Sequence, residues 1–217
     1  WIGLFAFTVQ IYFDFSAYSD MAIGIGALFG VILPENFNAP YRAQSIAQFW
    51  RSWHITLSQF LRDYLYIPLG GNRHGRIREY AALVVTMLLG GLWHGASWTF
   101  VVWGGVHGMA LALGHVWRRY TLPCPDLLGW LLTMMVVMLA WVLFRAADFA
   151  TAWRFYTALL AISSADSNIH VVRDLHSPLI LVIAFAVAVA GPTSQRVALV
   201  LMPARRSLAI VAGLAMA

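Results

Sequence analysis

Long apolar runs alternate along the chain with short stretches that hold most of the charged residues. Residues 81–117 contain no Asp, Glu, Lys or Arg, and two further apolar runs cover 127–144 and 177–195. A helix needs about 20 mostly apolar residues to cross the core of a bilayer, so each shorter run predicts one span. The run 81–117 is too long for one ordinary span. It predicts either two helices hinged near Gly90–Gly95 or one span with a re-entrant piece.

The other apolar segments carry polar interruptions. Residues 1–13 and 15–33 are apolar pieces interrupted by Asp14 and Asp20. These carboxylates are predicted either to cap or bridge helices at the membrane surface, or to line a polar path. Residues 149–162 have an amphipathic pattern, which favours a helix that lies along the membrane interface over one that crosses it.

Composition supports a membrane protein. Hydrophobic residues make up 61% of the chain and charged residues only 11%, far from the balance of soluble domains. The basic residues are all arginine and fall between the apolar runs, where they indicate orientation in a membrane and not a nucleic-acid surface. The pattern therefore predicts an all-α fold: a polytopic transmembrane helical bundle with interfacial and re-entrant helices, surrounded by membrane lipid.

The segment 40–68 predicts an interfacial helix bracketed by Pro40 and Pro68. Aromatic and apolar residues recur along it at the spacing of one helix face: Trp50, Trp53, Leu57, Phe60 and Tyr64. His54 and Ser58 border this stripe, and Arg62 is offset from it. We expect the tryptophans to lie at the depth of the lipid headgroups.

His94 is an ionisable group inside the apolar run 81–117. Such groups are costly in a membrane and usually face a cavity, a partner or a pathway. The alternative is a structural histidine that hydrogen-bonds to a neighbouring helix. Small residues flank His94, namely Gly90, Gly91, Gly95, Ala96 and Ser97. They leave room for either a neighbouring helix or a substrate, and the sequence does not separate the two.

Two other classes of membrane protein remain open from these histidines. His94 and His107 are 13 residues apart, a spacing that could place two axial haem ligands on one helix of an electron carrier. No second pair of histidines at that spacing supplies the partner helix. A transporter could instead use the buried histidines as a proton relay. The single cysteine, Cys124, has no second thiol with which to form a disulfide or a metal site, and we expect no bound metal or cofactor.

Four stretches in order along the chain carry a resemblance to a known family: YFDFSAYSDMAIGIGALFG, NFNAPYRAQSIAQFWRSWHITLSQFLRDYLYIPLGG, GLWHGASWTFVVWGGVHG and WVLFRA. Together they resemble the membrane-bound O-acyltransferase family, in its bacterial branch of alginate O-acetylases and teichoic-acid D-alanyl transferases. The resemblance covers most of residues 8–150. We expect residues 1–217 to form a single transmembrane catalytic domain, the C-terminal part of a longer protein, with the hairpin 81–117 carrying His94 and the region 40–68 carrying His54.

The resemblance implies an acyltransferase in which a tunnel brings an acyl donor and a hydroxyl acceptor together. His94 matches the histidine of the family's Trp-His-Gly motif, and His54, 40 residues upstream, matches the other member of its catalytic pair. His94 is then expected to act as general base, with either direct transfer or an acyl-histidine intermediate. His54 is expected to orient the acceptor, stabilise the oxyanion or shuttle a proton. Residues expected to wall the site or bind substrate are Trp93, Gly95, Trp98, Trp53, Ser58 and Arg62.

The resemblance also implies the substrates and partners. The donor is expected to be an acyl thioester, either acetyl-CoA or an acyl carrier protein. The acceptor is expected to be an extracytoplasmic polysaccharide, or a periplasmic acyltransferase that completes delivery to it. The acyl group is predicted to be acetyl, with D-alanyl transfer to teichoic acids as the alternative. The expected location is the bacterial inner membrane, with several spans.

Overall fold

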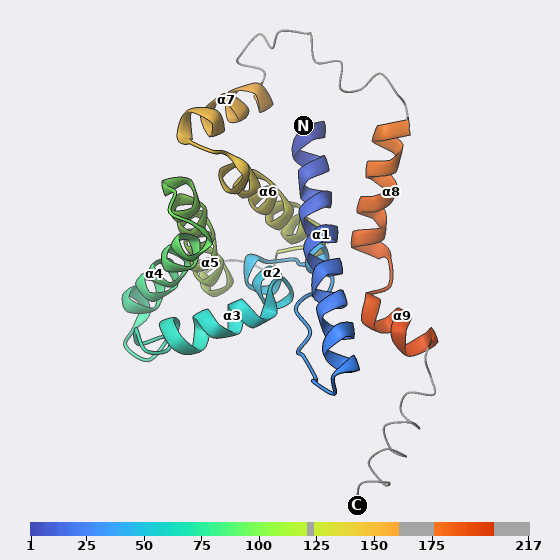
Figure 1. Cartoon of the computed structure of the whole chain (residues 1–217). Helices are drawn as coiled ribbons and strands as arrows, with labels where there is room; N and C mark the ends of the chain where they lie inside the picture. Colours follow the sequence, from blue (N-terminus) through green and yellow to red (C-terminus); the bar gives the residue numbers. More distant parts are fainter. Residues whose placement is uncertain (121–123, 161–175, 202–217) are drawn as a thin grey trace, which may run out of the picture.

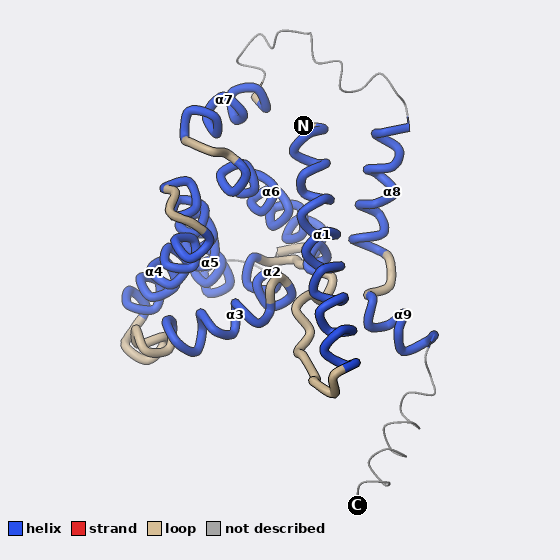
Figure 2. Tube along the Cα trace, viewed as in Figure 1, coloured by secondary structure: helices blue, strands red, loops and turns tan. Residues whose placement is uncertain are grey.

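The structure is a computed structural model, which describes residues 1–120, 124–160 and 176–201. Every regular element in these three ranges is helical, which confirms the all-α prediction (Figure 2). In chain order the elements are α1 (Ile2–Leu28), the 3-10 turn η1 (Pro40–Arg42), α2 (Ile46–Ser52), α3 (Ile55–Leu61), the π-helical turn η2 (Arg62–Tyr66), α4 (Arg76–His94), α5 (Trp98–Tyr120), α6 (Asp126–Arg145), α7 (Phe149–Leu159), α8 (His176–Ala190) and α9 (Ser194–Leu201).

Two of the described helices are long and apolar enough to cross a membrane. They are α5, with 23 residues, and α6, with 20 residues. At 1.5 Å per residue these helices extend over about 35 Å and about 30 Å, the thickness of a bilayer core. The helices α8 and α9 bend by 72° at a short break and would add a third span if they cross as one unit. The longer helix α1, which carries Asp14 and Asp20, falls outside this class.

The apolar run 81–117 forms a helical hairpin. One arm, α4, ends at His94, and the other, α5, begins at Trp98, so the predicted break lies at the glycine-rich turn. The two arms lie side by side (Figure 1). A Cβ atom added to Gly91 would overlap the carbonyl oxygen of Phe100 on the opposite arm. At this position the small residue therefore admits a neighbouring helix and not a substrate.

A cluster of aromatic rings forms the core between η1, α2, α5 and α6. Its members are Tyr41, Phe49, Trp50, Trp53, Trp103 and Trp141. Trp53 stacks on Phe49 with a centroid distance of 5.6 Å and lies 5.2 Å from the Trp141 ring. Only 7% of the surface of Trp50 and 4% of that of Trp53 are exposed. Aromatic residues of η1 and of the later helices enclose both tryptophans, so they pack in the core of the protein, and their position at headgroup depth stays a prediction.

The prediction of one continuous helix between Pro40 and Pro68 is wrong. The chain forms η1, α2, α3 and η2 in this range, and the helix breaks at Trp53 and His54. His54 adopts a left-handed backbone conformation with φ of 43°, which no continuous α-helix contains. The break changes the exposed face, so Phe60 and Tyr64, which continue the sequence stripe, are 52% and 68% exposed.

Candidate active site

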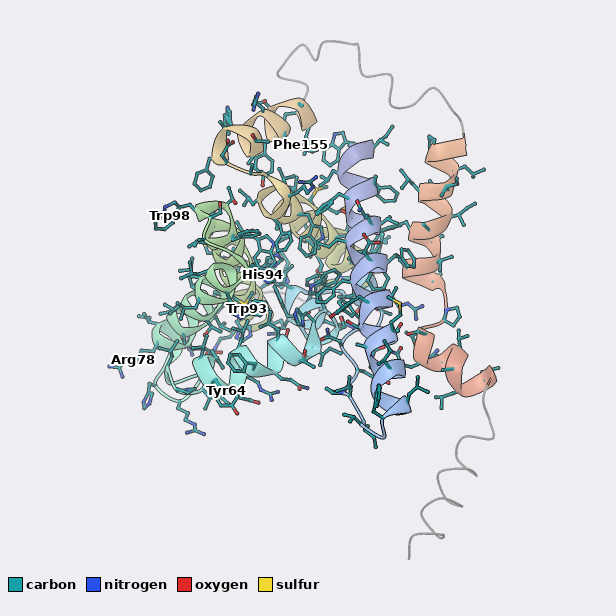
Figure 3. The ribbon with its side chains drawn as sticks, viewed as in Figure 1. Tyr64, Arg78, Trp93, His94, Trp98 and Phe155 are labelled. Carbon is teal, nitrogen blue, oxygen red and sulfur yellow. The ribbon has the colours of Figure 1, made fainter. Side chains whose placement is uncertain are left out.

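His94 lies at the end of α4, where the hairpin turns. Its ring is half-buried among aromatic side chains of three helices, with centroids 5.1 Å from Trp93 on α4, 5.1 Å from Trp103 on α5 and 5.2 Å from Phe144 on α6. Figure 3 shows the ring lying inside the bundle. Among the described residues, neither ring nitrogen of His94 has a hydrogen-bond partner. The imidazole is therefore held by packing while its nitrogens are left for another group.

Gly95 allows the turn that follows His94. A Cβ atom at this position would come within 2.8 Å of the Phe100 ring, which is closer than any side chain tolerates. Phe100 also lies 6.3 Å from the His94 ring. A larger residue at position 95 would displace Phe100 and with it one wall around His94.

His54 lies at the junction of α2 and α3. Its Nδ1 is 3.1 Å from Oδ1 of Asn36, and its ring meets Phe15 of α1 edge-on at 4.9 Å. Burial, and then the nearby His94, lower the pKa of His54 to about 4. The imidazole is therefore neutral near pH 7, the form in which one of its nitrogens can accept a proton.

The structure brings the two predicted histidines into one site. Trp93 lies between them: its ring is 6.4 Å from that of His54 and 5.1 Å from that of His94. His94 is also close enough to His54 to contribute to the low pKa of His54. A break between two short helices and the tip of a hairpin, 40 residues apart in sequence, thus meet around Trp93.

The other predicted site residues divide into two groups. Trp53 lies behind the site in the aromatic core, and Ser58 donates a hydrogen bond to the Trp53 carbonyl at 3.3 Å. Trp98 is 75% exposed, and Figure 3 shows its side chain projecting outward at the start of α5. Arg62 is exposed and pairs with the adjacent Asp63 at 2.7 Å. The structure therefore places neither Trp98 nor Arg62 with the histidine pair.

Three residues around the histidines were not foreseen from the sequence. They are Asn36, which hydrogen-bonds to His54, and the rings of Phe15 and Phe144. All three lie in stretches that carried the family resemblance, which was the available signal: Phe15 in YFDFSAYSDMAIGIGALFG, Asn36 at the start of NFNAPYRAQSIAQFWRSWHITLSQFLRDYLYIPLGG, and Phe144 in WVLFRA. Asn36 lies in the loop before η1, and its role depends on the unforeseen break at His54.

The remaining histidines of α5 have structural partners. His107 is fully buried, and its Nδ1 accepts a hydrogen bond from Nε1 of Trp50 at 3.3 Å. His115 pairs with Glu79 of α4 at 2.9 Å. The haem hypothesis required His94 and His107 on one helix, but the turn after His94 places them on different arms of the hairpin. The prediction that the 13-residue spacing places two haem ligands on one helix is therefore wrong.

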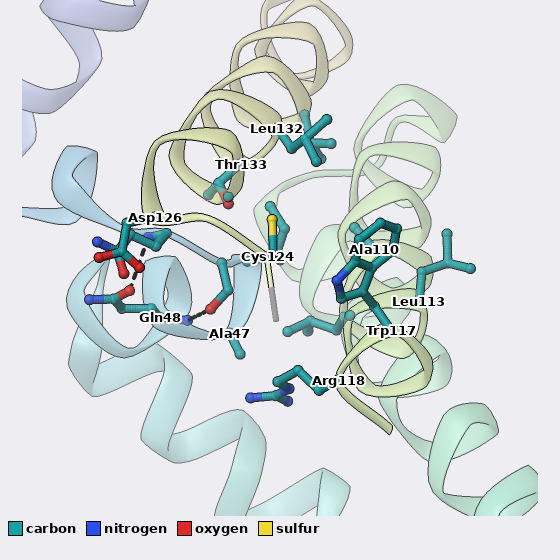
Figure 4. A pocket seen from close by; sticks show the side chains of 17 residues that line it. Ala47, Gln48, Ala110, Leu113, Trp117, Arg118, Cys124, Asp126, Leu132 and Thr133 are labelled. Carbon is teal, nitrogen blue, oxygen red and sulfur yellow. Dashed lines mark hydrogen bonds between the residues drawn. The ribbon is translucent and has the colours of Figure 1, made fainter. Parts of the chain in front are cut away.

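A groove of about 700 Å³ lies elsewhere on the molecule, between the start of α2, the second half of α5 and the first half of α6 (Figure 4). Trp117 and Arg118 line one side and Thr133 the other. Neither His54 nor His94 lines it. Among the described residues, no group of three or more His, Cys, Asp or Glu side chains is placed to hold a metal ion.

The fold and site describe a helical membrane protein in which two half-buried histidines, His54 and His94, meet among aromatic rings. Residues 1–150 match the family model of the membrane-bound O-acyltransferase (MBOAT) family. The chain belongs to that family.

Named relatives share much of this chain. A probable alginate O-acetylase of Azotobacter vinelandii is 53% identical over 162 residues, 74% of this chain and 32% of the relative. A peptidoglycan O-acetyltransferase of Helicobacter pylori is 48% identical over 167 residues, 75% of this chain and 32% of the relative. A teichoic acid D-alanyltransferase of Streptococcus thermophilus is 30% identical over 123 residues, 54% of this chain and 30% of the relative. The chain spans about a third of the length of these relatives.

Proposed function

We propose that this chain carries the histidine pair of a membrane O-acyltransferase, which moves an acetyl group from a thioester donor towards hydroxyl groups of an extracytoplasmic polysaccharide. The observation that carries the proposal is the meeting of His54 and His94 around Trp93, in a chain that belongs to an O-acyltransferase family. The pair is half-buried among aromatic rings, and a site of this kind, once the substrates fill it, limits hydrolysis of an activated acyl group.

In the proposed reaction, the neutral His94 acts as general base. It takes the proton of the acceptor hydroxyl as that oxygen attacks the carbonyl carbon of the thioester. The new C–O ester bond forms, the C–S bond breaks, and the leaving thiolate takes up the proton that His94 accepted, which returns His94 to its neutral form. Holding the hydroxyl and the thioester together in one pocket lowers the entropy cost of the encounter.

The choice of acetyl over D-alanyl transfer rests on the comparisons. The relatives named as O-acetylases or O-acetyltransferases are 48% and 53% identical over three quarters of this chain, whereas the D-alanyltransferase of Streptococcus thermophilus is 30% identical over about half of it. The polysaccharide acceptor is proposed on the same ground.

The proposal places the enzyme in the bacterial inner membrane, with several spans. The helices α5 and α6 suit crossing of a bilayer, and lipid is the proposed surrounding of their apolar faces. The proposed donor is acetyl-CoA or an acylated carrier protein. A periplasmic acyltransferase is the proposed partner wherever delivery to the polysaccharide takes a second step.

The test compares a strain that lacks the gene with the same strain complemented by the complete gene. Ester-bound acetate and ester-bound D-alanine are released from the purified surface polymers by mild alkali and quantified separately. We expect acetate to be lost on deletion and restored on complementation, with D-alanine unchanged. Loss of D-alanine alone would overturn the acetyl assignment. If neither ester changes while a solute or proton flux is lost, the protein is a transporter instead.

A further inference from the structure

A hydrogen-bond network centred on Asn36 holds the break between α2 and α3. The Asn36 side-chain oxygen Oδ1 lies 3.1 Å from Nδ1 of His54, and it accepts from the Thr56 hydroxyl at 2.9 Å and from the Thr56 backbone N–H at 3.3 Å. The Asn36 amide nitrogen donates to the Ser19 hydroxyl of α1 at 3.2 Å. The Asn36 backbone carbonyl accepts from the N–H of Ile55 at 3.0 Å.

This network determines which way the Asn36 amide faces. A backbone N–H can only donate, so the side-chain atom of Asn36 that faces Thr56 must be the oxygen. The same oxygen faces Nδ1 of His54, and an amide oxygen can only accept. Nδ1 of His54 must therefore carry the proton. In the neutral ring, Nε2 is then unprotonated and can only accept a hydrogen bond.

We propose that Asn36 is a positioning residue of the active site, which fixes His54 as its Nδ1–H tautomer and so makes Nε2 an acceptor for the hydroxyl of the acyl acceptor. This inference rests on the proposed function. It decides between the roles open to His54, because a neutral ring whose Nε2 lacks a proton cannot donate to an oxyanion from that nitrogen. His54 orients the hydroxyl or passes on its proton, and stabilisation of the oxyanion falls to other groups.

A purely structural role is the competing explanation. Asn36 satisfies the first backbone N–H groups of α3, at Ile55 and Thr56, as a helix cap does. Removing it could loosen the loop without any effect on the chemistry. The two explanations differ in the tautomer of His54 and in the effect of Asn36→Asp. Aspartate also caps a helix, and its negative charge additionally favours the protonated imidazole.

The test reads the tautomer directly. The complete protein is labelled with 15N-histidine, reconstituted into lipid bilayers and studied by solid-state NMR, with the His54 signals identified by their loss in His54→Ala. We expect protonated Nδ1 and unprotonated Nε2 in the wild type, and loss of this preference in Asn36→Ala. In Asn36→Asp the pH at which His54 titrates should rise by about 1 unit or more. The matched control is Asn38→Ala, an exposed asparagine of the same loop whose side chain makes no hydrogen bond among the described residues.

Ester-bound acetate in complemented strains, at matched membrane levels, provides the second readout. We expect Asn36→Ala to lower acetylation by about 10- to 100-fold, because a His54 ring without a fixed tautomer loses part of the roughly 10²- to 10⁴-fold that a positioned acid–base group contributes. Asn36→Asp should restore most of the loss, and Asn38→Ala should match the wild type. A wild-type His54 protonated on Nε2, or a tautomer unchanged in Asn36→Ala, would overturn the inference. Full acetylation in His94→Ala would instead overturn the proposed function and leave the NMR result standing.

Discussion

Replacing Gly91 by alanine tests the close approach of α4 and α5 that holds His94 in place. Gly91 lies one turn before His94, and the two atoms nearest to an added Cβ are the backbone oxygen and carbonyl carbon of Phe100. Backbone atoms cannot rotate away as a flexible side chain can, so the two arms must separate. Because Phe100 also neighbours the His94 ring, the separation should disturb the site as well as the fold.

The magnitude combines two opposing effects. Alanine is a better helix former than glycine by about 1 kcal/mol. Forcing an extra carbon into a packed contact costs about 1–3 kcal/mol, and a backbone neighbour favours the upper end of that range. We therefore expect Gly91→Ala to lower the free energy of unfolding by about 2 kcal/mol.

Gly114→Ala is the matched control. It makes the same change in α5, where an added Cβ would meet no heavy atom within 4 Å. It should stabilise the protein by about 1 kcal/mol through helix propensity alone. The assay is thermal unfolding of the complete protein in detergent, with wild type and both variants measured side by side. A Gly91→Ala protein as stable as Gly114→Ala would refute the tight hairpin.

Two further predictions concern the walls of the site and a helix cap. Trp93→Ala should lower acetyl transfer by about tenfold or more, because the Trp93 ring lies near both histidines. The Trp98 side chain points outward, so Trp98→Ala should lower transfer far less. Equal losses of acetate in the two variants would contradict this prediction. Asp148 caps α7, and its hydrogen bond from a backbone N–H of the first turn lowers the pKa of the Asp148 carboxyl. The pKa of Asp148 is lower in the folded protein than its ordinary value of about 4. The cap therefore stabilises α7 fully above that ordinary value, and the stabilisation is lost as the pH falls through the pKa of the folded protein. Hydrogen exchange in α7, corrected for intrinsic rates, should therefore lose protection in acid in the wild type, whereas Asp148→Asn, which keeps a neutral cap, should lose this pH dependence.

The helical hairpin could be predicted from the sequence because its signals are local. A run of 37 residues without a charge, with glycines at its centre, describes two apolar helices and a turn, and α4 and α5 follow that pattern. The helix predicted over 127–144 is likewise confirmed by α6 (Asp126–Arg145), which is long and apolar enough to cross a membrane. In both cases the helix ends lie within a few residues of the change in composition.

The break at His54 could not be predicted in the same way. The spacing of Trp50, Trp53 and Leu57 fits one helix face, and the left-handed residue between them has no local sequence signal. The break is stabilised by contacts with an upstream loop. The Asn36 side chain contacts His54, 18 residues later, and the backbone N–H of Asn38 donates to the Ser52 carbonyl. Such non-local hydrogen bonds override a helical pattern that is only locally favourable.

The measurement that tests the central claim most directly compares His94→Ala with His74→Ala in acetyl transfer. His74 is an exposed histidine in the loop before α4, so its removal makes the same chemical change away from the site. Each variant of the complete protein is expressed in the deletion strain at matched membrane levels, and ester-bound acetate on the surface polysaccharide is quantified. The account predicts that acetate is lost with His94→Ala and retained with His74→Ala. Acetate at the wild-type level in His94→Ala would contradict the assignment of His94 as the base.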